Sequence, residues 1–305
     1  MIDPAGALYV HYLRFSVECF RRKGVEFQSF FEQIMGKADP SFIAVKPSGK
    51  EGDWKNDGYS GATRTVFQVY APLEVTVAAT VAKIKEDFEG AKLRWKGKMD
   101  GWTFVWSAEK ALPPQVLAAL LDIKNDNGDL TIENWGQERL WQMVEGLDES
   151  DRVELFGPLP QLETATTVVV QVTAAEVQTL LHYLVDVKDG FEIDDDLSLI
   201  ALRDKMDRNQ FSSAVRSVID GGLPLLGTVG YYVNKSPDER FSQRVSLALS
   251  AAYEELRQTF EGDADKIFFG LLARIAPEAG PDRKEYWAAV AIVDFYFELC
   301  DIFEK

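Results

Sequence analysis

A group of polar residues in the first quarter of the chain has the types and spacing of a divalent-metal site. Asp57 ends a polar turn, and Gln68 follows eleven residues later in the strand-like segment Thr65–Pro72. If the two segments pair as a hairpin, the Asp57 carboxylate and the Gln68 amide oxygen can reach one cation. The backbone carbonyl of Val69 would add a third oxygen. All three are the hard ligands that Mg²⁺ prefers.

Other charged residues nearby suit hydrolysis of a phosphodiester at such a site. The reaction needs a water that can lose a proton and a cation that neutralises the developing charge. Lys55 in the preceding turn can neutralise a phosphate or position the water. Glu32 is the charged member of an otherwise apolar helix face and is predicted to point toward the same sheet. Glu51 and Asp53 are within reach as alternative ligands or as groups that support the ligands.

The segments around these residues alternate between strand and helix patterns. Alternation of this kind predicts an α/β domain. Helices are predicted at residues 8–23, Val25–Met35, Val75–Phe88, Pro113–Leu121 and Glu138–Val144. Strands are predicted at Phe42–Val45, Thr63–Tyr70, Leu93–Trp95, Trp102–Trp106 and Leu130–Ile132.

The predicted linker is Phe156–Pro160. After it the predicted secondary structure changes from alternating strands and helices to mainly helices. Residues 1–158 are expected to form a mixed sheet flanked by helices. Residues 159–305 are expected to be mainly helical, with Thr166–Val172 as a candidate strand, and to serve partner binding or oligomerisation. The last predicted helix, Tyr286–Phe303, is apolar almost all round, which suits either a buried helix or a subunit contact.

Composition narrows the class of protein. No apolar run reaches the roughly 18 residues that a transmembrane helix needs. The first residues lack a basic stretch followed by an apolar core, so no secretory signal is expected. Cys19 and Cys300 are too few for a disulfide scaffold, which fits a cytoplasmic protein. The two histidines, His11 and His182, argue against a histidine-built zinc site.

The net charge of −16 is unevenly distributed along the chain. Residues 1–100 contain 15 Lys and Arg against 13 Asp and Glu, out of totals of 33 and 49. The acidic excess therefore belongs to the C-terminal two thirds, and a phosphate-binding surface is expected only in the first part. Because the basic excess there is small, DNA affinity is expected to depend on partners or on oligomerisation.

Three short motifs resemble one family of nucleases. They are Phe30–Glu32, Gly52–Tyr59 and Phe67–Pro72, which together follow the order of the PD-(D/E)XK restriction-endonuclease superfamily in its Gln-x-Lys branch. More narrowly, they resemble the nuclease domain of CBASS endonucleases and of the nuclease subunit of Lamassu, or ABC three-component, antiphage systems. The segments Leu180–Asn209 and Phe241–Leu256 are similar to the helical domain of the three-component proteins.

This resemblance implies a restriction-endonuclease-like first domain that cuts double-stranded DNA with Mg²⁺ or Mn²⁺. It implies metal-binding roles for Glu32, Asp57 and Gln68. It also implies two partners, an SMC/Rad50-like coiled-coil ATPase and a small third subunit, which hold the nuclease inactive until foreign DNA is sensed. Contacts with DNA are expected from Lys50 and Arg64.

The sequence departs from the superfamily at Tyr70, which occupies the position of the usual lysine. We expect Lys55 to take over that role, with Tyr70 beside the ligands; the alternative is a catalytically weak chain. A different class of function also fits, namely an inactive nuclease-fold scaffold whose acidic helical domain binds protein partners. For an active protein, homo-oligomerisation through the apolar last helix is expected.

Overall fold

The computed structural model describes residues 4–46, 55–72, 76–107, 112–159, 168–169, 171–186, 202–238, 240–299 and 302–303. Their contacts divide the chain into two compact units. One unit spans Glu18–Leu155, and we call it the α/β unit; the other combines Met1–Val17 with Phe156–Lys305, and we call it the helical unit. The sequence placed residues 1–158 in the first domain, whereas the contacts group residues 1–17 with the helical unit.

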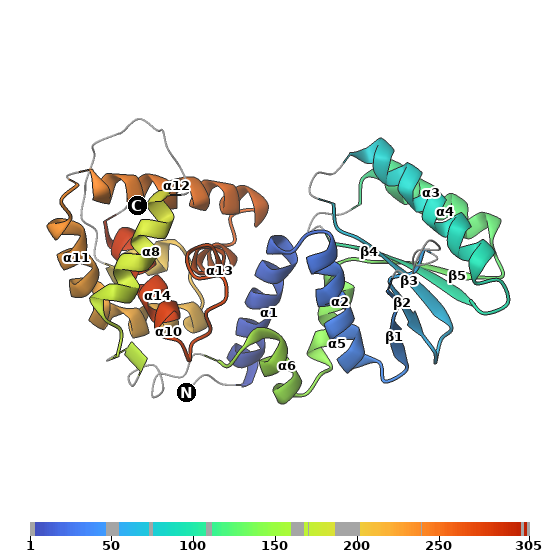
Figure 1. Cartoon of the computed structure of the whole chain (residues 1–305), viewed down its shortest axis with the longest axis horizontal. Helices are drawn as coiled ribbons and strands as arrows, with labels where there is room; N and C mark the ends of the chain where they lie inside the picture. Colours follow the sequence, from blue (N-terminus) through green and yellow to red (C-terminus); the bar gives the residue numbers. More distant parts are fainter. Residues whose placement is uncertain are drawn as a thin grey trace. The chain divides into compact units, whose positions relative to one another are not determined.

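A five-stranded mixed sheet forms the centre of the α/β unit (Figure 1). The strands follow one another across the sheet in chain order. The first three pair antiparallel, while β3, β4 and β5 run parallel. Their bounds are β1 (Phe42–Ala44), β2 (Gly58–Ser60), β3 (Thr65–Tyr70), β4 (Gly101–Trp106) and β5 (Thr131–Trp135).

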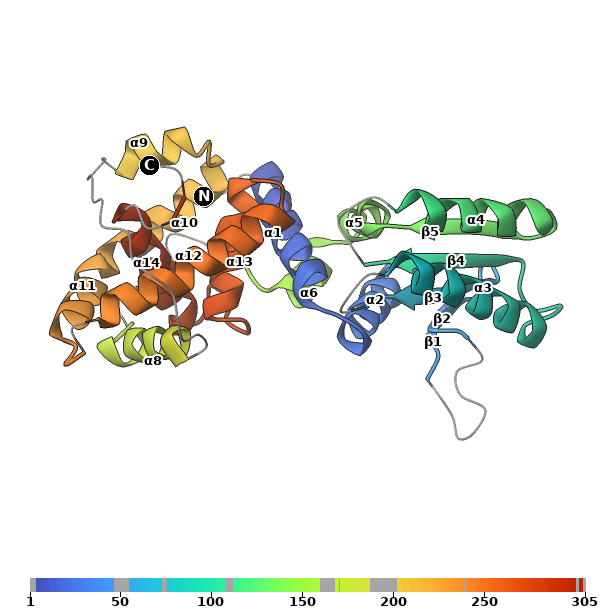
Figure 2. The same cartoon turned by 90° about the horizontal axis from the view of Figure 1, so that it is seen from above.

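Helices cover both faces of this sheet. The helices α3 (Val77–Arg94) and α4 (Pro114–Asp126) pack side by side over one face, as Figure 2 shows. The helices α2 (Val25–Ala38) and α5 (Gln137–Glu145) pack against the strands from the other face. A further helix, α6 (Glu149–Phe156), ends at the boundary of the unit. The expected α/β architecture, with a mixed sheet flanked by helices, is confirmed.

The alternation of side chains along β3 decides which residues face which helices. Val66 is buried in the core that α3 and α4 form with the sheet. Phe67 points the other way and packs against Phe31 of α2 and Trp135 of β5, with ring centroids 5.5 Å and 5.2 Å away. Gln68, two residues after Val66, therefore lies on the α3 face.

The helical unit is built around its last long helix, α14 (Lys284–Glu298). Its residues are buried almost without interruption, and it packs against α8, α10, α11 and α13 (Figure 1). The buried-helix interpretation is confirmed. The expectation that copies assemble through this helix is wrong, because other helices already cover it. The unit contains α8 (Ala174–Asp186), α9 (Leu202–Arg208), α10 (Ser213–Gly222), η2 (Leu223–Leu225), α11 (Leu226–Lys235), α12 (Phe241–Thr259), α13 (Ala264–Ile275) and most of α1 (Pro4–Arg21).

Two predicted strands differ from the structure. Leu93 and Arg94 end α3, and Trp95 begins the following turn, because a short apolar run does not distinguish strand from helix. Within Thr166–Val172, Val168 and Val169 are helical, and part of the segment lies outside the described residues. Among the described helices, none is long and apolar enough to cross a membrane.

Candidate functional site

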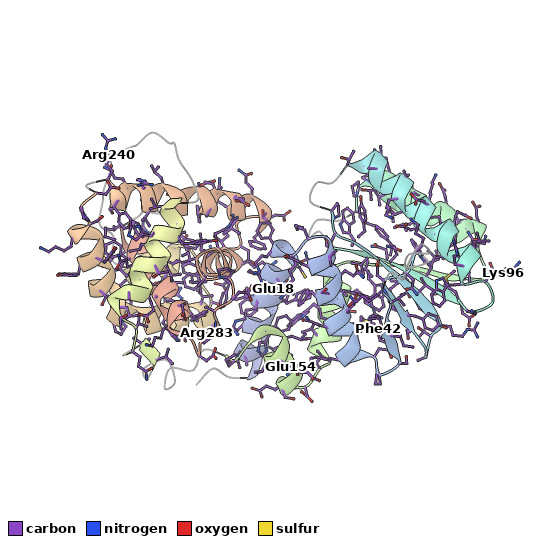
Figure 3. The ribbon with its side chains drawn as sticks, viewed as in Figure 1. Glu18, Phe42, Lys96, Glu154, Arg240 and Arg283 are labelled. Atoms are coloured by element: carbon purple, nitrogen blue, oxygen red, sulfur yellow. The ribbon has the colours of Figure 1, made fainter. Side chains whose placement is uncertain are left out.

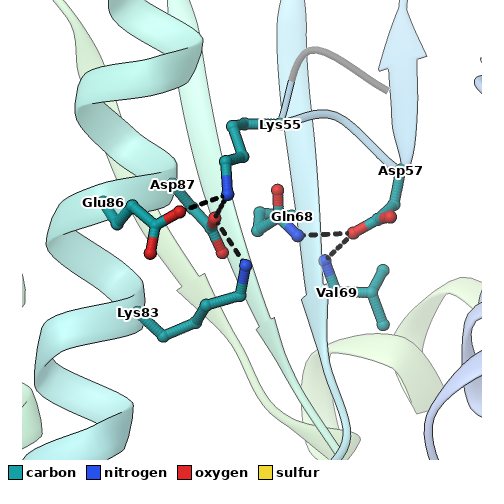
Figure 4. Close-up of polar contacts among 7 residues, drawn as sticks. All are labelled: Lys55, Asp57, Gln68, Val69, Lys83, Glu86 and Asp87. Carbon is teal, nitrogen blue, oxygen red and sulfur yellow. Dashed lines mark hydrogen bonds and ion pairs between the residues drawn. The ribbon is translucent and has the colours of Figure 1, made fainter. Parts of the chain in front are cut away.

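The β2–β3 hairpin brings Asp57 and Gln68 into direct contact (Figure 4). Gly58 pairs with Phe67, and the Asp57 amide donates to the Phe67 carbonyl at 2.9 Å. The Gln68 Nε2 donates to the Asp57 Oδ2 at 2.8 Å, and the Val69 amide donates to the same oxygen at 2.7 Å. The predicted juxtaposition of a carboxylate, an amide and the Val69 backbone is therefore present in the structure.

The turn before β2 fixes the position of Asp57. The buried Asn56 side chain accepts a hydrogen bond from the Gly58 amide at 2.8 Å, a turn that Asn forms readily. A Cβ on Gly58 would lie 2.4 Å from the Phe42 ring, so only glycine fits under that ring without displacing it. Lys55 has a left-handed backbone with φ 57°, which turns the chain before the strand begins.

Both members of the Asp57–Gln68 pair are buried, with 6% and 7% of their surfaces exposed. One polar atom of the pair is left over: the Gln68 Oε1 is buried and has no hydrogen-bond partner among the described atoms. A buried amide oxygen without a partner carries a desolvation cost of about 1–3 kcal/mol. The Gln68 Oε1 is therefore available to bind a cation or to accept a hydrogen bond from a water.

Lys55 does not contact the Asp57–Gln68 pair through any described ion pair, and it reaches instead to helix α3. Its Nζ lies 2.6 Å from the Glu86 Oε1 and 3.0 Å from the Asp87 Oδ1 (Figure 4). Lys83 approaches the same Asp87 oxygen at 2.8 Å. The hydrogen bond with Glu86, together with Asp87, raises the pKa of the Lys55 ammonium group.

Asp87 is the functional candidate that the sequence analysis did not find. It is 1% exposed and lies on the buried stripe of α3 together with Ile84, Phe88 and Ala91. An acidic residue on such a stripe was the signal available in the sequence, because a buried carboxylate needs positively charged partners. Here the two lysines provide them, while its Oδ2 is buried with no hydrogen-bond partner among the described atoms.

Glu32 lies on α2, which packs on the face of the sheet opposite α3. Its carboxylate accepts hydrogen bonds from the Lys46 ammonium group at 2.6 Å and 2.8 Å and from the Gln28 amide at 3.1 Å. Among the described residues these are its polar contacts, and the structure gives it none with the Asp57–Gln68 pair. Asp57, Gln68 and Val69 thus form one close group, and Glu32 stands apart from it.

The remaining predicted residues have varied positions. The Tyr70 ring packs against Phe104 and Trp106, with centroids 5.8 Å and 5.9 Å away, and belongs to the aromatic core. Arg64 lies in the turn just before β3 and pairs with Asp100 at 3.0 Å. The candidates Lys50, Glu51 and Asp53 lie outside the described residues. Across the part of the chain that is described, no group of three or more His, Cys, Asp or Glu side chains could hold a metal ion.

Comparison with known protein families gives one match. Residues 175–304 match C-terminal domain 10 of the ABC-three component (ABC-3C) systems. This match supports a role for the chain as a component of an antiphage defence system. The match covers α8 to α14 of the helical unit, and because this domain belongs to multi-component systems, it supports the presence of partner subunits. Searches of curated proteins and of solved structures gave no match.

Proposed function

We propose that this protein is the DNA-cutting subunit of an ABC-3C complex and that Asp57 and Gln68 hold its Mg²⁺ or Mn²⁺ ion. The observation that carries the proposal is the buried 2.8 Å contact between the Asp57 carboxylate and the Gln68 amide. The C-terminal domain supports a role in antiphage defence, for which cleavage of invading double-stranded DNA is a direct means. An SMC/Rad50-like ATPase and a small third subunit are the proposed partners.

The oxygens present suit a hard divalent cation. Mg²⁺ is commonly bound by one or two carboxylates, with waters and substrate phosphates completing its octahedron. Neighbouring ligands of such an ion, each about 2.1 Å from the metal, lie roughly 3 Å apart. The Asp57 Oδ2 and the Gln68 amide nitrogen are 2.8 Å apart, and turning the amide over would replace that nitrogen with oxygen. The buried, unpartnered Gln68 Oε1 also supports this assignment.

The backbone around the pair prepares Asp57 for such a role. The Val69 amide holds the Asp57 carboxylate in one orientation at 2.7 Å. Because a strand residue directs its N–H and C=O toward the same side, the Val69 carbonyl also faces the Asp57 side. A bound cation would lower the pKa of a water and neutralise charge on the phosphate. The β2–β3 hairpin would keep the oxygens of Asp57, Gln68 and Val69 in fixed positions.

Lys55 is the proposed cation for the charge that develops on the phosphate. Its partner Glu86 is 65% exposed, and exposed ion pairs contribute little stability. A substrate phosphate can therefore replace Glu86, while the buried Asp87 continues to hold the lysine. Glu32 is retained in the proposal as a further oxygen ligand, which Lys46 would first have to release. Assembly of several copies would use a surface other than α14.

A second candidate function is a catalytically inactive scaffold. Two observations favour it: Tyr70 is packed among aromatic rings, and Lys55 is bound to α3 carboxylates. On this alternative the hairpin is a remnant of a nuclease centre, and the helical unit carries the protein's contribution to the complex.

Cleavage of supercoiled plasmid tests both functions. The wild type, alone and with its partner subunits, is incubated with Mg²⁺, Mn²⁺ or EDTA. Asp57→Ala should reduce metal-dependent cleavage by at least about 100-fold. Asp122→Ala, at an exposed carboxylate on α4, is the matched control and should cleave normally. Equal cleavage by wild type and Asp57→Ala would refute the assignment, and no cleavage with intact complex formation would favour the scaffold.

A further inference from the structure

Five exposed cations gather at the end of the sheet where β3 and β4 begin, away from the Asp57–Gln68 pair. We call this group the basic rim. Four of its members fall within seven residues at the end of α3 and in the following turn, and they are four of the 15 Lys and Arg in residues 1–100. The rim consists of Arg64, Lys92, Arg94, Lys96 and Lys98.

Hydrogen bonds between the β2–β3 turn and the α3–β4 turn hold the rim together. The Arg64 guanidinium donates to the Gly97 carbonyl at 2.6 Å, and the Asp100 amide donates to the Arg64 carbonyl at 2.9 Å. The Tyr59 hydroxyl donates to the Lys98 carbonyl at 2.9 Å. The Tyr59 ring also stacks on Trp95, with centroids 5.3 Å apart and planes at 16°. The backbone that carries the cations is therefore ordered before any ligand binds, which reduces the entropic cost of binding.

The rim keeps a positive excess although acidic residues lie near it. Asp100 is paired with Arg64 at 3.0 Å. Lys92 donates a hydrogen bond to the Asn127 side chain. The exposed Asp126 and Asp129, on either side of Asn127 in the sequence, therefore also lie near the rim. Residues 92–100 carry four cations and one carboxylate, in a chain whose net charge is −16.

Two lysines of the rim are well placed for a ligand. Lys96 and Lys98 are exposed and form no ion pair among the described residues. Figure 3 shows the Lys96 side chain projecting from its turn away from the ribbon. Leu93, which is 74% exposed, lies in the same segment. A fixed row of lysines and arginines at this spacing suits a polymer of phosphates.

The distance to the proposed centre suits the same ligand. Gln68 is four residues beyond Arg64 along β3, which corresponds to about 13 Å at 3.3 Å per residue. Duplex DNA carries one charge per about 1.7 Å of its axis, so about 13 Å of duplex presents roughly eight phosphate charges. A duplex that reaches the Asp57–Gln68 pair can therefore also extend over the rim.

We propose that the basic rim binds the phosphate backbone of duplex DNA and positions it for the hairpin centre. The choice of DNA rests on the proposed function, whereas the rim itself is a separate surface. Each lysine or arginine that contacts a phosphate releases counterions and steepens the salt dependence of binding. The contribution of the rim is therefore measurable without cleavage.

The experiment measures binding of a labelled 30-base-pair duplex in EDTA at several salt concentrations. The triple variant Arg94→Gln, Lys96→Gln, Lys98→Gln should lower the slope of log K against log salt by up to about 2.7. Between 50 and 200 mM salt, wild-type affinity should then fall about 40-fold more than that of the variant. The matched control is Lys235→Gln, Arg240→Gln, Arg257→Gln, which makes the same charge change at exposed sites of the helical unit.

The outcomes separate this inference from the proposed function. Three results would each refute the proposal that the basic rim binds DNA. They are an unchanged salt slope in the rim variant, an equal change of slope in the control, and no duplex binding by the wild type. A loss of self-association with an unchanged DNA slope would also overturn it and would indicate that the rim binds an acidic protein surface. If the wild type binds DNA through the rim but never cuts it, the proposal that the rim binds DNA holds and the nuclease proposal fails.

Discussion

The Gln68 amide and the Asp57 carboxylate lie 2.8 Å apart across adjacent antiparallel strands, and both are buried. Their separation follows from the β2–β3 register, which pairs Gly58 with Phe67. A second carboxylate in place of Gln68 would repel Asp57 whenever no cation is present. A neutral amide therefore keeps the hairpin stable in the metal-free protein, while its oxygen can still serve as a ligand.

Gln68→Glu should make the stability of the protein depend on divalent cations. Two carboxylates at this distance should destabilise the metal-free protein by about 1–3 kcal/mol, because one of them is left buried without a partner. Mg²⁺ should recover most of that loss, since an ion that binds only the folded state stabilises it. Urea unfolding with EDTA and with Mg²⁺ measures both effects. Gln115→Glu, at an exposed position on α4, should respond to neither; a Gln68→Glu protein indifferent to Mg²⁺ would argue against a cation at the pair.

The ion pair of Lys55 with Asp87 should contribute more to stability than its ion pair with Glu86. Glu86 is the nearer group at 2.6 Å and the larger cause of the raised pKa of Lys55, but it is 65% exposed, while Asp87 is 1% exposed. Solvent weakens the first interaction. Double-mutant cycles with Lys55→Met should give a coupling of about 1 kcal/mol for Asp87→Asn and a smaller coupling for Glu86→Gln. A larger coupling to Glu86 would show that burial does not decide the contribution.

Lys55 and Tyr70 should differ in their effect on cleavage. Lys55→Gln should reduce the rate by about 100-fold or more, because it removes the cation proposed for the phosphate. Tyr70→Phe should leave cleavage within about twofold, since the only described side-chain hydrogen bond of its hydroxyl is a long contact of 3.5 Å with Thr80. Single-turnover cleavage of plasmid measures both rates. A severe loss in Tyr70→Phe with a normal Lys55→Gln would reverse the assigned roles.

The sequence was sufficient to predict the hairpin and the architecture of the α/β unit. The eleven-residue spacing of Asp57 and Gln68, with a turn between two strand patterns, determines a contact that the structure contains. The mixed sheet flanked by helices likewise follows from alternating local patterns, which report on nearby residues.

Features that depend on packing between distant segments were missed. The acidic Asp87 on the buried stripe of α3 was a local signal, but its partner Lys55 is 32 residues away in the sequence, so no local pattern reveals their contact. Residues 1–17 belong with the helical unit through contacts such as the Tyr9 hydroxyl to Asp265, at 3.0 Å, which no local pattern encodes. The burial of α14 was one of two alternatives, and only its neighbouring helices decide between them.

Asp294→Asn should stabilise the helical unit at neutral and alkaline pH. Asp294 is fully buried, and neither carboxylate oxygen has a hydrogen-bond partner among the described atoms. Burial, with the carboxylates of Asp220 and Glu298, raises the pKa of Asp294 well above its ordinary value. The folded state therefore binds this proton more tightly than the unfolded state. Wild-type stability should fall as pH rises from about 4 toward the raised pKa.

The denaturation midpoint of Asp294→Asn should exceed that of the wild type by at least about 2 °C at pH 8. The difference should become smallest below about pH 3, where the wild-type carboxyl is protonated in both states. Asp220→Asn, at an exposed carboxylate, is the control and should shift the midpoint less. A variant that is less stable than wild type at pH 8 would contradict the account of this residue.

The most direct measurement of the central claim is a Mn²⁺ titration followed by electron paramagnetic resonance, on wild type, Asp57→Asn, Gln68→Ala and the exposed-site control Asp122→Asn. If Asp57 and Gln68 hold one cation, the wild type and Asp122→Asn should bind one Mn²⁺ with equal affinity. Asp57→Asn should lose that binding and Gln68→Ala should weaken it by about tenfold or more. Unchanged Mn²⁺ affinity in Asp57→Asn would contradict the claim that this hairpin is a metal centre.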